Sequence, residues 1–388
     1  MHARGGRFSD ADKAAYAQAE ADRARRAHHL AVASAVSQSA PAARDGVMPP
    51  AQMTAVDAAA QRKAAFLGNG AMKSADRVVP ISGAIATVRI VERDGQQLIA
   101  KMYDPTASPS TKQHLDNELA LAGRLRHPNI IAPRRAVRLD DGRVELEMEY
   151  ASGGSLGDYV KRAKYAAGGH RGLAEREAAA LLFGLVDAVH YLHGNGVVHG
   201  DVKLGNAMID RAVVRLIDFG TASVIQQAGT SPPPPRLCGT LAYTPPEGLE
   251  AFFAPDGASG LAPADGRPGD IWALGVVLVN LLTLGDFPFA GRDEESLRAA
   301  ISAGAPRLPA GLSESCAELL GSMLARDPRQ RATAASVHRH PWLTSVPRVD
   351  AADPMVATDI SAHLAHLLPP NGAPAGGQLF KGGGARGR

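Results

Sequence analysis

The distribution of apolar and polar positions along the middle of the chain first predicts a strand-rich part. In residues 77–104, β-branched residues mix with polar ones, and Asp-Gly at 94–95 predicts a turn between two strands. Residues 111–127 are interpreted as a helix. Residues 136–150 are interpreted as a second hairpin, which turns at Asp-Gly 141–142. This part of the chain is therefore predicted to be β-rich.

After Gly153 and Gly154 the pattern becomes mainly helical. Residues 174–196 form a long apolar stretch that ends in two glycines, as is typical of a helix terminus. Residues 270–285 are apolar on all sides, which predicts a buried helix. A β-rich part, a glycine hinge and a helical part together predict two lobes with a cleft between them.

Both ends of the chain differ in texture from its middle. Residues 1–76 are rich in alanine, and within them residues 9–36 predict a helix with Ser9 as its N-cap. Its apolar positions are nearly all alanine, so it can bury little area, and we expect a partly helical or disordered extension. Residues 344–388 are rich in Gly and Pro and predict a disordered tail. The folded domain is predicted to be residues 77–343.

Composition and charge exclude several classes of function. The formal net charge of +3 argues against a nucleic-acid binder driven by electrostatics. The two cysteines, Cys238 and Cys316, form no CxxC motif, so a reducing compartment is expected, and we place the protein in the cytoplasm or nucleus. The chain has no run of about 18 apolar residues, so no membrane span is expected. Residues 1–18 lack the apolar core of a secretory signal.

The segment VVHGDVKLGN, residues 197–206, contains the residue types that phosphoryl transfer needs. Asp201 is the candidate acceptor of a hydroxyl proton, because a carboxylate can orient the hydroxyl and take its proton. Asn206 can offer a neutral oxygen to a metal ion, and Lys203 can contact the transferring phosphate. His199 is expected to be a packed structural residue. Small-molecule kinases and protein kinases both contain a loop of this kind, and this one has features of each.

Three further residues extend this chemistry along the chain. Lys101 follows a predicted strand and can reach the α- and β-phosphates of ATP if an acid fixes its side chain, with Glu118 as the candidate. Asp218, in Ile-Asp-Phe-Gly at 217–220, is the candidate second metal ligand. Mg²⁺ prefers one or two carboxylates together with phosphate oxygens. The expected cofactors are therefore ATP and Mg²⁺, or Mn²⁺ in its place.

Taken together, residues 77–343 resemble a eukaryotic-type protein kinase domain. The motifs that carry the resemblance are, in chain order, Lys101, Glu118, the loop 197–206, Asp218-Phe-Gly, Cys-Gly-Thr at 238–240, Pro-Pro-Glu at 245–247, Asp-Ile-Trp-Ala-Leu-Gly at 270–275 and residues 324–343. Small-molecule kinases of the aminoglycoside type lack the activation segment, the Pro-Glu motif and the 270–275 helix. The ending at 324–343 is closest to the calcium/calmodulin-dependent and AMP-activated-kinase-like group.

The resemblance implies an α+β fold with a small β-rich N-lobe and a larger helical C-lobe. It implies that Lys203 and Thr240 form the serine/threonine-specific arrangement, in which the threonine bridges Asp201 and the lysine. It also implies that Glu247 pairs with Arg331 inside the large lobe. The implied adenine site consists of Met148 as gatekeeper, backbone groups of Glu149 and Ala151, and the apolar side chains of Val88, Ala100 and Met208.

The chain departs from the family pattern in the loop that covers the phosphates. The family has Gly-x-Gly-x-x-Gly-x-Val, whereas this chain has Ile81, Gly83, Ala86 and Val88 at the defining positions. Glycine matters there because its backbone N–H can approach phosphate without a Cβ in the way. The loop is still expected to contact nucleotide through Ile81, Gly83 and Val88. Weaker ATP binding is expected, and a pseudokinase or scaffold is the alternative function.

Two more departures concern regulation and the protein surface. Gly200 replaces the arginine that normally receives a phosphate on the activation loop. We therefore hypothesise that activity does not depend on phosphorylation of that loop. Residues 248–269 are interpreted as a surface insertion. The expected function is transfer of the ATP γ-phosphate to serine and threonine hydroxyls of protein substrates by a monomer, without a membrane or specific nucleic acid, and a small-molecule kinase is a less favoured alternative.

Overall fold

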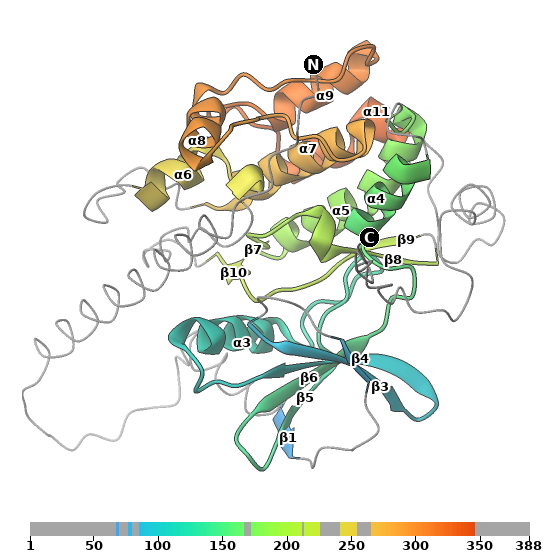
Figure 1. The fold of residues 1–388 in the computed structure, drawn as a ribbon, viewed down its shortest axis with the longest axis vertical. Coiled ribbons are helices and arrows are strands. Elements are labelled where there is room, and N and C mark those ends of the chain that lie inside the picture. The colour runs from blue at the N-terminus through green and yellow to red at the C-terminus, as the bar shows by residue number, and fades with distance from the viewer. Residues whose placement is uncertain are drawn as a thin grey trace, which may run out of the picture.

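The computed structural model describes residues 67–69, 77–79, 85–166, 172–211, 213–225, 241–253 and 265–345. The helix predicted at 9–36 and the tail from residue 346 onward lie outside the described residues. A strand-rich lobe and a helical lobe lie one against the other, joined through the segment between β6 and α4 (Figure 1). The predicted two-lobed α+β fold is confirmed.

In the described part of the chain, the small lobe is a six-stranded sheet with the order β1-β5-β6-β4-β3-β2. All neighbours in this sheet are antiparallel except β1 and β5, which are parallel. The strands are β1 (Leu67–Asn69), β2 (Arg77–Val79), β3 (Thr87–Arg93), β4 (Gln96–Tyr103), β5 (Arg135–Arg138) and β6 (Val144–Glu149). Strand β1 belongs to the segment 1–76, which the sequence analysis treats as an extension.

The two predicted hairpins are present, and each turns at its Asp-Gly pair. Asp94 and Gly95 both have positive φ, 51° and 74°, the conformation of a tight hairpin turn that suits right-twisted strands. In the second hairpin, Gly142 has a φ of 86° and donates its N–H to Leu139 O at 3.0 Å. Glycine at these positions avoids the strain that a Cβ would introduce. The first hairpin sets the register of β4, on which Lys101 lies, against β3, and β6 of the second hairpin pairs with the other side of β4.

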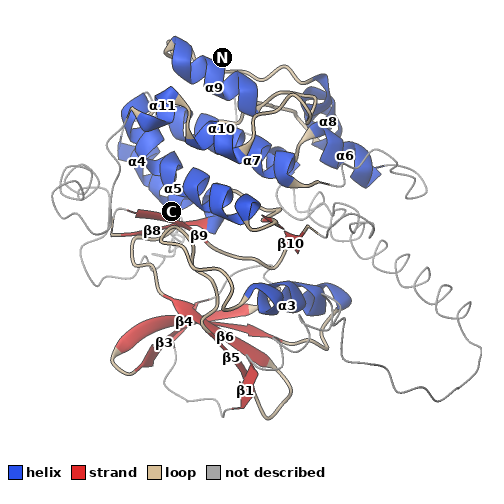
Figure 2. Cartoon of the chain, turned by 180° about the vertical axis from the view of Figure 1, so that it is seen from behind, coloured by secondary structure: helices blue, strands red, loops and turns tan. Residues whose placement is uncertain are grey.

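Helix α3 (Pro109–Leu121) packs beside the sheet of the small lobe (Figures 1 and 2). Ser108 caps it by accepting the N–H of Thr111 at 3.0 Å, and Pro109 occupies the first turn, where its missing N–H is harmless. The predicted bounds 111–127 are wrong. The helix starts earlier because of this cap, and it ends earlier because the chain turns at Gly123, whose φ is 71°.

The large lobe is built mainly of helices (Figure 2). They are α4 (Leu156–Ala166), α5 (Glu175–Gly194), α6 (Pro246–Phe253), α7 (Arg267–Thr283), α8 (Glu294–Ala303), α9 (Glu314–Met323), α10 (Ala334–His338) and α11 (Pro341–Thr344). Every residue of α7 from 270 to 282 is buried, which confirms the predicted buried helix. Within the described residues, no helix combines the length and the apolar character that a membrane crossing requires.

Short strands line the side of the large lobe that faces the sheet (Figure 2). They are β7 (Val197–Val198) with β10 (Ser223–Val224), and β8 (Ala207–Asp210) with β9 (Val213–Leu216). The loops that follow β7 and β9 carry the predicted catalytic residues. Of the predicted insertion 248–269, residues 248–253 belong to α6 and residues 267–269 to α7, while 254–264 lie outside the described residues.

Candidate active site

A lysine from the small lobe contacts one carboxylate from each lobe. The Nζ of Lys101, on β4, donates hydrogen bonds to Glu118 Oε1 of α3 at 2.6 Å and to Asp218 Oδ1 at 2.8 Å. Asp218 lies two residues after β9 and belongs to the large lobe. The sequence predicted that Glu118 would fix Lys101, and the structure places the two side chains in contact.

Burial and charge act against each other in this cluster. Burial alone would lower the pKa of Lys101, but Glu118 and Asp218 together hold that pKa well above its usual range. Burial likewise favours a raised pKa for Asp218, yet the Lys101 ammonium holds it well below its usual range. Burial raises the pKa of Glu118. Lys101 therefore stays cationic and Asp218 stays ionised under physiological conditions.

Tyr103, which no sequence motif indicated, contacts the same carboxylate. Its hydroxyl donates to Glu118 Oε1 at 3.1 Å, and both side chains are about 1% exposed. Lys101 and Tyr103 are two residues apart on β4, so their side chains lie on one face of the strand. That spacing, with a polar aromatic residue beside a buried lysine, is the signal that could have identified Tyr103.

Asp201 is held by two neighbours from its own loop. Lys203 Nζ donates to Asp201 Oδ2 at 2.7 Å, and Asn206 Nδ2 donates to the same oxygen at 2.8 Å. Within the described residues, no hydrogen bond uses Oδ1 of Asp201, so this oxygen can accept one from a substrate hydroxyl. Burial raises the pKa of Asp201, while Lys203 opposes that rise. A carboxylate with a raised pKa is a stronger proton acceptor.

Asp270 of α7 fixes the backbone of this loop. No sequence motif indicated this contact. The two carboxylate oxygens of Asp270 accept the N–H groups of His199 and Gly200, both at 2.9 Å. His199 is fully buried, accepts the Asp201 N–H on Nδ1 at 3.2 Å and places Nε2 at 3.1 Å from Ile217 O. The predicted structural role of His199 is confirmed by this packing.

Asn206 and Asp218, the predicted metal ligands, lie next to each other. Asn206 O accepts the N–H of Ile217 at 2.9 Å, which brings the two loops together. Both side-chain hydrogen bonds of Asn206 use Nδ2, so its Oδ1 remains available to a cation. Asp218 is in the left-handed region with a φ of 68°, and its side chain is 40% exposed. An amide oxygen and an exposed carboxylate are donors that suit Mg²⁺.

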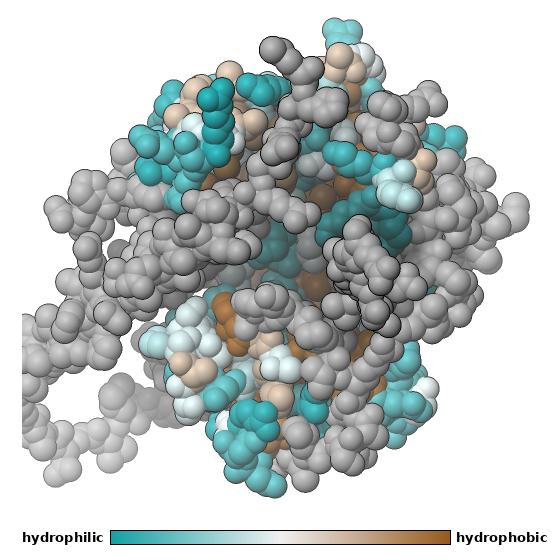
Figure 3. Space-filling model, in the orientation of Figure 1, coloured by the Kyte–Doolittle hydropathy of each residue, from teal (hydrophilic) through white to brown (hydrophobic). Residues whose placement is uncertain are grey.

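Apolar residues predicted to enclose adenine gather at the same edge of the small lobe. Met148, Ala151 and Met208 belong to one apolar cluster, and Ala86 of the phosphate-covering loop packs in it too. Ala100 is fully buried on β4. Apolar side chains (brown) show in the hollow between the lobes, opposite hydrophilic ones of the large lobe (Figure 3). This arrangement suits a ring bound between apolar faces.

Of the other predicted nucleotide contacts, some lie in the described part of the chain and some lie outside it. Val88 is half-buried and pairs with Lys101 across β3 and β4. Glu149 was predicted to act through its backbone, and its side chain forms ion pairs with Arg134 and Arg215. Three predicted site residues lie outside the described residues, namely Ile81, Gly83 and Thr240.

The predicted pair inside the large lobe is confirmed. Arg331 donates from Nη1 and Nη2 to the two oxygens of Glu247 at 2.6 and 3.0 Å, a bidentate geometry. The Arg331 side chain is fully buried, and its guanidinium lies 5.0 Å from the centroid of the Trp272 ring. This pair ties α6 to the segment between α9 and α10 and supports the large lobe without touching the cluster around Lys101.

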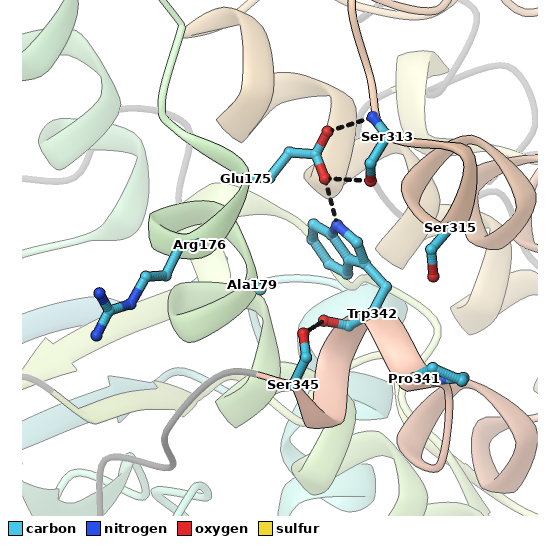
Figure 4. Close-up of a pocket in the computed structure, with 8 residues that line it drawn as sticks. All are labelled: Glu175, Arg176, Ala179, Ser313, Ser315, Pro341, Trp342 and Ser345. Atoms are coloured by element: carbon cyan, nitrogen blue, oxygen red, sulfur yellow. Dashed lines mark hydrogen bonds between the residues drawn. The ribbon is translucent and has the colours of Figure 1, made fainter.

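A separate cavity of about 500 Å³ lies beside the first turns of α5, at the end of this helix that is remote from the catalytic loop (Figure 4). There Glu175 accepts hydrogen bonds from the N–H and hydroxyl of Ser313 and from Trp342 Nε1, at 2.7, 2.6 and 2.7 Å. Glu175 is the first residue of α5 and Gly194 the last, so roughly 30 Å of helix separates this cavity from the catalytic loop. These hydrogen bonds tie the start of α5 to the N-cap of α9 and to α11.

Comparison with known proteins agrees with this geometry. The family model of the protein kinase domain matches residues 82–343, about two thirds of the chain. Among curated proteins, the chain is similar to sperm motility kinase Z of Mus musculus, with 35% identity over 58% of this chain and 41% of that protein. It is also similar to NUAK family SNF1-like kinase 2 of Homo sapiens, with 31% identity over 71% of this chain and 39% of that protein.

A third relative is protein kinase kin1 of Schizosaccharomyces pombe, with 33% identity over 58% of this chain and 23% of that protein. The chain thus spans less than half the length of each of these curated relatives. All three relatives are named as kinases, and one of them as a SNF1-like kinase of the NUAK family. From the match over residues 82–343 and the geometry of its site, the chain belongs to the protein kinase family.

Proposed function

We propose that this chain is an active protein kinase that transfers the γ-phosphate of ATP to serine and threonine hydroxyls of protein substrates. The observation that carries the proposal is the contact of Lys101 with Glu118 and Asp218, at 2.6 and 2.8 Å. This contact brings the phosphate-binding lysine and a metal-binding carboxylate together across the cleft. Phosphoryl transfer depends mainly on such positioning and charge compensation.

In the proposed reaction, the substrate hydroxyl donates a hydrogen bond to Asp201. Its oxygen attacks the γ-phosphorus, the bond from that phosphorus to the bridging oxygen breaks, and ADP leaves. The hydroxyl proton passes to the Asp201 carboxylate, whose Oδ2 is held by Lys203 and Asn206 at 2.7 and 2.8 Å. Lys101 is proposed to contact the α- and β-phosphates, and Lys203 the transferring phosphate.

Asn206 and Asp218 are the residues that would hold Mg²⁺ or Mn²⁺. The ion would neutralise charge on the phosphate oxygens. Asn206 serves a second purpose, because its Nδ2 donates to both the backbone oxygen and Oδ2 of Asp201, at 2.9 and 2.8 Å. A single side chain is thereby proposed to align the proton acceptor with the metal position.

Specificity for serine and threonine is supported by Lys203 in the catalytic loop. The adenine is proposed to bind between Val88 and Ala100 on one side and Met208 on the other. The Ala86 side chain is buried in the neighbouring apolar cluster, where the family pattern has glycine. We therefore propose that the enzyme binds ATP less tightly than relatives with the full glycine pattern.

The test is a phosphoryl-transfer assay with radiolabelled ATP, Mg²⁺ and generic basic proteins, followed by identification of the phosphorylated residues. We expect transfer to serine and threonine, and a loss of at least roughly a hundredfold in Asp201→Asn. The exposed Asp286→Asn, in the same lobe, serves as the matched control and retains activity. Nucleotide-dependent thermal stabilisation of the native chain without any transfer would support the scaffold function instead.

A further inference from the structure

The Glu118 carboxylate is buried and depends on very few donors. Its Oε1 accepts from Lys101 Nζ at 2.6 Å and from the Tyr103 hydroxyl at 3.1 Å. Its Oε2 has no hydrogen-bond partner among the described residues. An ionised carboxylate without sufficient donors is strongly unfavourable in a buried site. Lys101 and Tyr103 therefore each contribute strongly to holding the Glu118 carboxylate in its buried position.

Among the described residues, helix α3, which carries Glu118, is held by apolar side chains and by a hydrogen bond to the large lobe. Leu115 and Leu119 pack in the apolar cluster of the small lobe, together with the Tyr103 ring. Asn117 donates from Nδ2 to Gly220 O at 2.7 Å, which ties the helix to the segment after Asp218. An outward displacement of α3 would take Glu118 into water and away from Lys101. The position of α3 thus decides whether Lys101 is aligned.

We propose that Tyr103 is a positioning residue, whose hydroxyl holds Glu118, and with it α3, in the place where Glu118 pairs with Lys101. The inference rests on the proposed function, since the alignment of Lys101 matters for ATP. The Tyr103 hydroxyl is a second donor to Oε1 of Glu118. It is neutral, so the negatively charged phosphates do not draw it away from Glu118 as they draw the Lys101 ammonium. Lys101 can therefore turn toward the nucleotide while Glu118 stays bound.

A second donor is most useful when Lys101 has other partners. Lys101 also contacts Asp218 at 2.8 Å and is proposed to contact the nucleotide phosphates. Among the described residues, the Tyr103 hydroxyl has no competing partner, because it is buried against Glu118. The Lys101 ammonium lies 5.3 Å from the centroid of the Tyr103 ring, and a phenylalanine ring would preserve that contact. Tyr103→Phe therefore removes the hydroxyl alone.

The chain provides a matched control for this substitution. Tyr159, on α4, is fully buried like Tyr103, but its hydroxyl has no hydrogen-bond partner among the described residues. Tyr159→Phe also removes one buried hydroxyl while keeping the ring. It lies outside the catalytic loop and outside α3. A general effect of losing a buried hydroxyl would appear in both variants, whereas the proposed effect appears in Tyr103→Phe alone.

The experiment compares the full-length native chain with both variants. For Tyr103→Phe we expect kcat/KM for ATP to fall roughly fivefold, as for the loss of one hydrogen bond, with KM for the protein substrate unchanged. In the nucleotide-free protein, amide hydrogen exchange in residues 109–121 should rise by a similar factor. Tyr159→Phe should change neither quantity, and equal changes in the two variants would overturn the proposal.

A double-mutant cycle tests whether Tyr103 acts through Glu118. The affinity for a fluorescent ATP analogue is measured for Tyr103→Phe, for Glu118→Ala and for the double variant. We expect the effect of Tyr103→Phe to disappear once Glu118 is alanine, because the two changes share one interaction. Fully additive effects would contradict the proposal.

The hydrogen-exchange measurement separates the two hypotheses. If the native chain transfers no phosphate but Tyr103→Phe loosens α3, the proposed function fails and the positioning role stands. If the native chain is active and the exchange of α3 is identical in both variants, the positioning role fails and the proposed function stands.

Discussion

The Nε2 atom of His193 lies 2.9 Å from Oδ2 of Asp270, and both side chains are buried. The same Asp270 oxygen accepts the N–H of His199, and the other oxygen accepts that of Gly200. Burial would raise the pKa of Asp270, but the hydrogen bond from His193 and the electrostatic effect of His193 and His199 lower that pKa. The last turn of α5 thus supports the catalytic loop through one carboxylate.

We expect Asp270→Asn to reduce both stability and activity, because the amide presents an N–H₂ group where a backbone N–H needs an acceptor. A buried donor left without a partner costs about 1–3 kcal/mol. Urea unfolding should show a loss of this size, and kcat should fall at least roughly tenfold if the loop is displaced. The exposed Asp286→Asn, in the same lobe, should match the native chain in both measurements. Native-like kcat in Asp270→Asn would contradict this support role.

The pH dependence of the proposed reaction should reflect Asp201. Burial raises its pKa and Lys203 opposes the rise, so removal of that cation raises the pKa further. Because Asp201 must be deprotonated to accept the hydroxyl proton, the acidic limb of the pH–kcat/KM profile should move to higher pH in Lys203→Met. The exposed Lys161→Met serves as the control and should leave the profile in place. A shift to lower pH would refute the assignment of Asp201 as the proton acceptor.

Gly200 should resist substitution by any residue with a Cβ. Its φ is 77°, and a Cβ would lie 3.2 Å from Thr221 O. We expect Gly200→Ala to destabilise the protein by about 1 kcal/mol in chemical denaturation, because alanine avoids this conformation. Gly194→Ala, where a Cβ would meet nothing within 4 Å, is the matched control and should be neutral or stabilising. Equal stability of the two variants would argue against strain at Gly200.

Activity should be insensitive to phosphatase treatment, because Gly200 provides no cation to receive a phosphate on the activation loop. The specific activity of the recombinant protein is measured before and after treatment with a broad-specificity phosphatase, with removal of phosphate confirmed by mass spectrometry. A large fall in specific activity would show that another cation takes the place of the missing arginine.

Breaking the Glu247–Arg331 pair should destabilise the large lobe more than any single surface change. Removing one partner of a buried ion pair typically costs about 3–5 kcal/mol, because the other charge stays buried and unpaired. We therefore expect Arg331→Met to lower the stability measured in urea by an amount in this range. The exposed Arg329→Met, two residues away, should change it by less than about 0.5 kcal/mol. Comparable losses in both variants would contradict the structural role of the pair.

Most of the fold could be predicted from the chain because its local signals are strong. The Asp-Gly turns at 94–95 and 141–142 coincide with hairpins, and the mainly apolar stretch at 270–282 is a buried helix. The end of α3 could not be placed, since residues after Leu121 look helical and are held instead by contacts with the large lobe. Arg126, for example, donates its N–H to the Tyr191 hydroxyl of α5 at 3.2 Å. Such distant pairing leaves no local pattern.

The site shows the same division between local and distant information. Lys101, Asp201, Asn206 and Asp218 stand out because each belongs to a short motif with a chemical purpose. Tyr103 and Asp270 do not, because their importance depends on which group folds against them. A tyrosine on a strand or an aspartate near a helix start is ordinary in sequence. Only the positions of Glu118 and of the backbone at residues 199–200 make these residues significant.

The double contact of Lys101 has a mechanical consequence. Glu118 moves with the small lobe and Asp218 with the large lobe, so rotation of one lobe against the other must lengthen one contact or the other. The position of the Lys101 ammonium is therefore coupled to the relative orientation of the two lobes. The nitrogen chemical shift of an isotope-labelled Lys101 ammonium would therefore report how far the two lobes have opened.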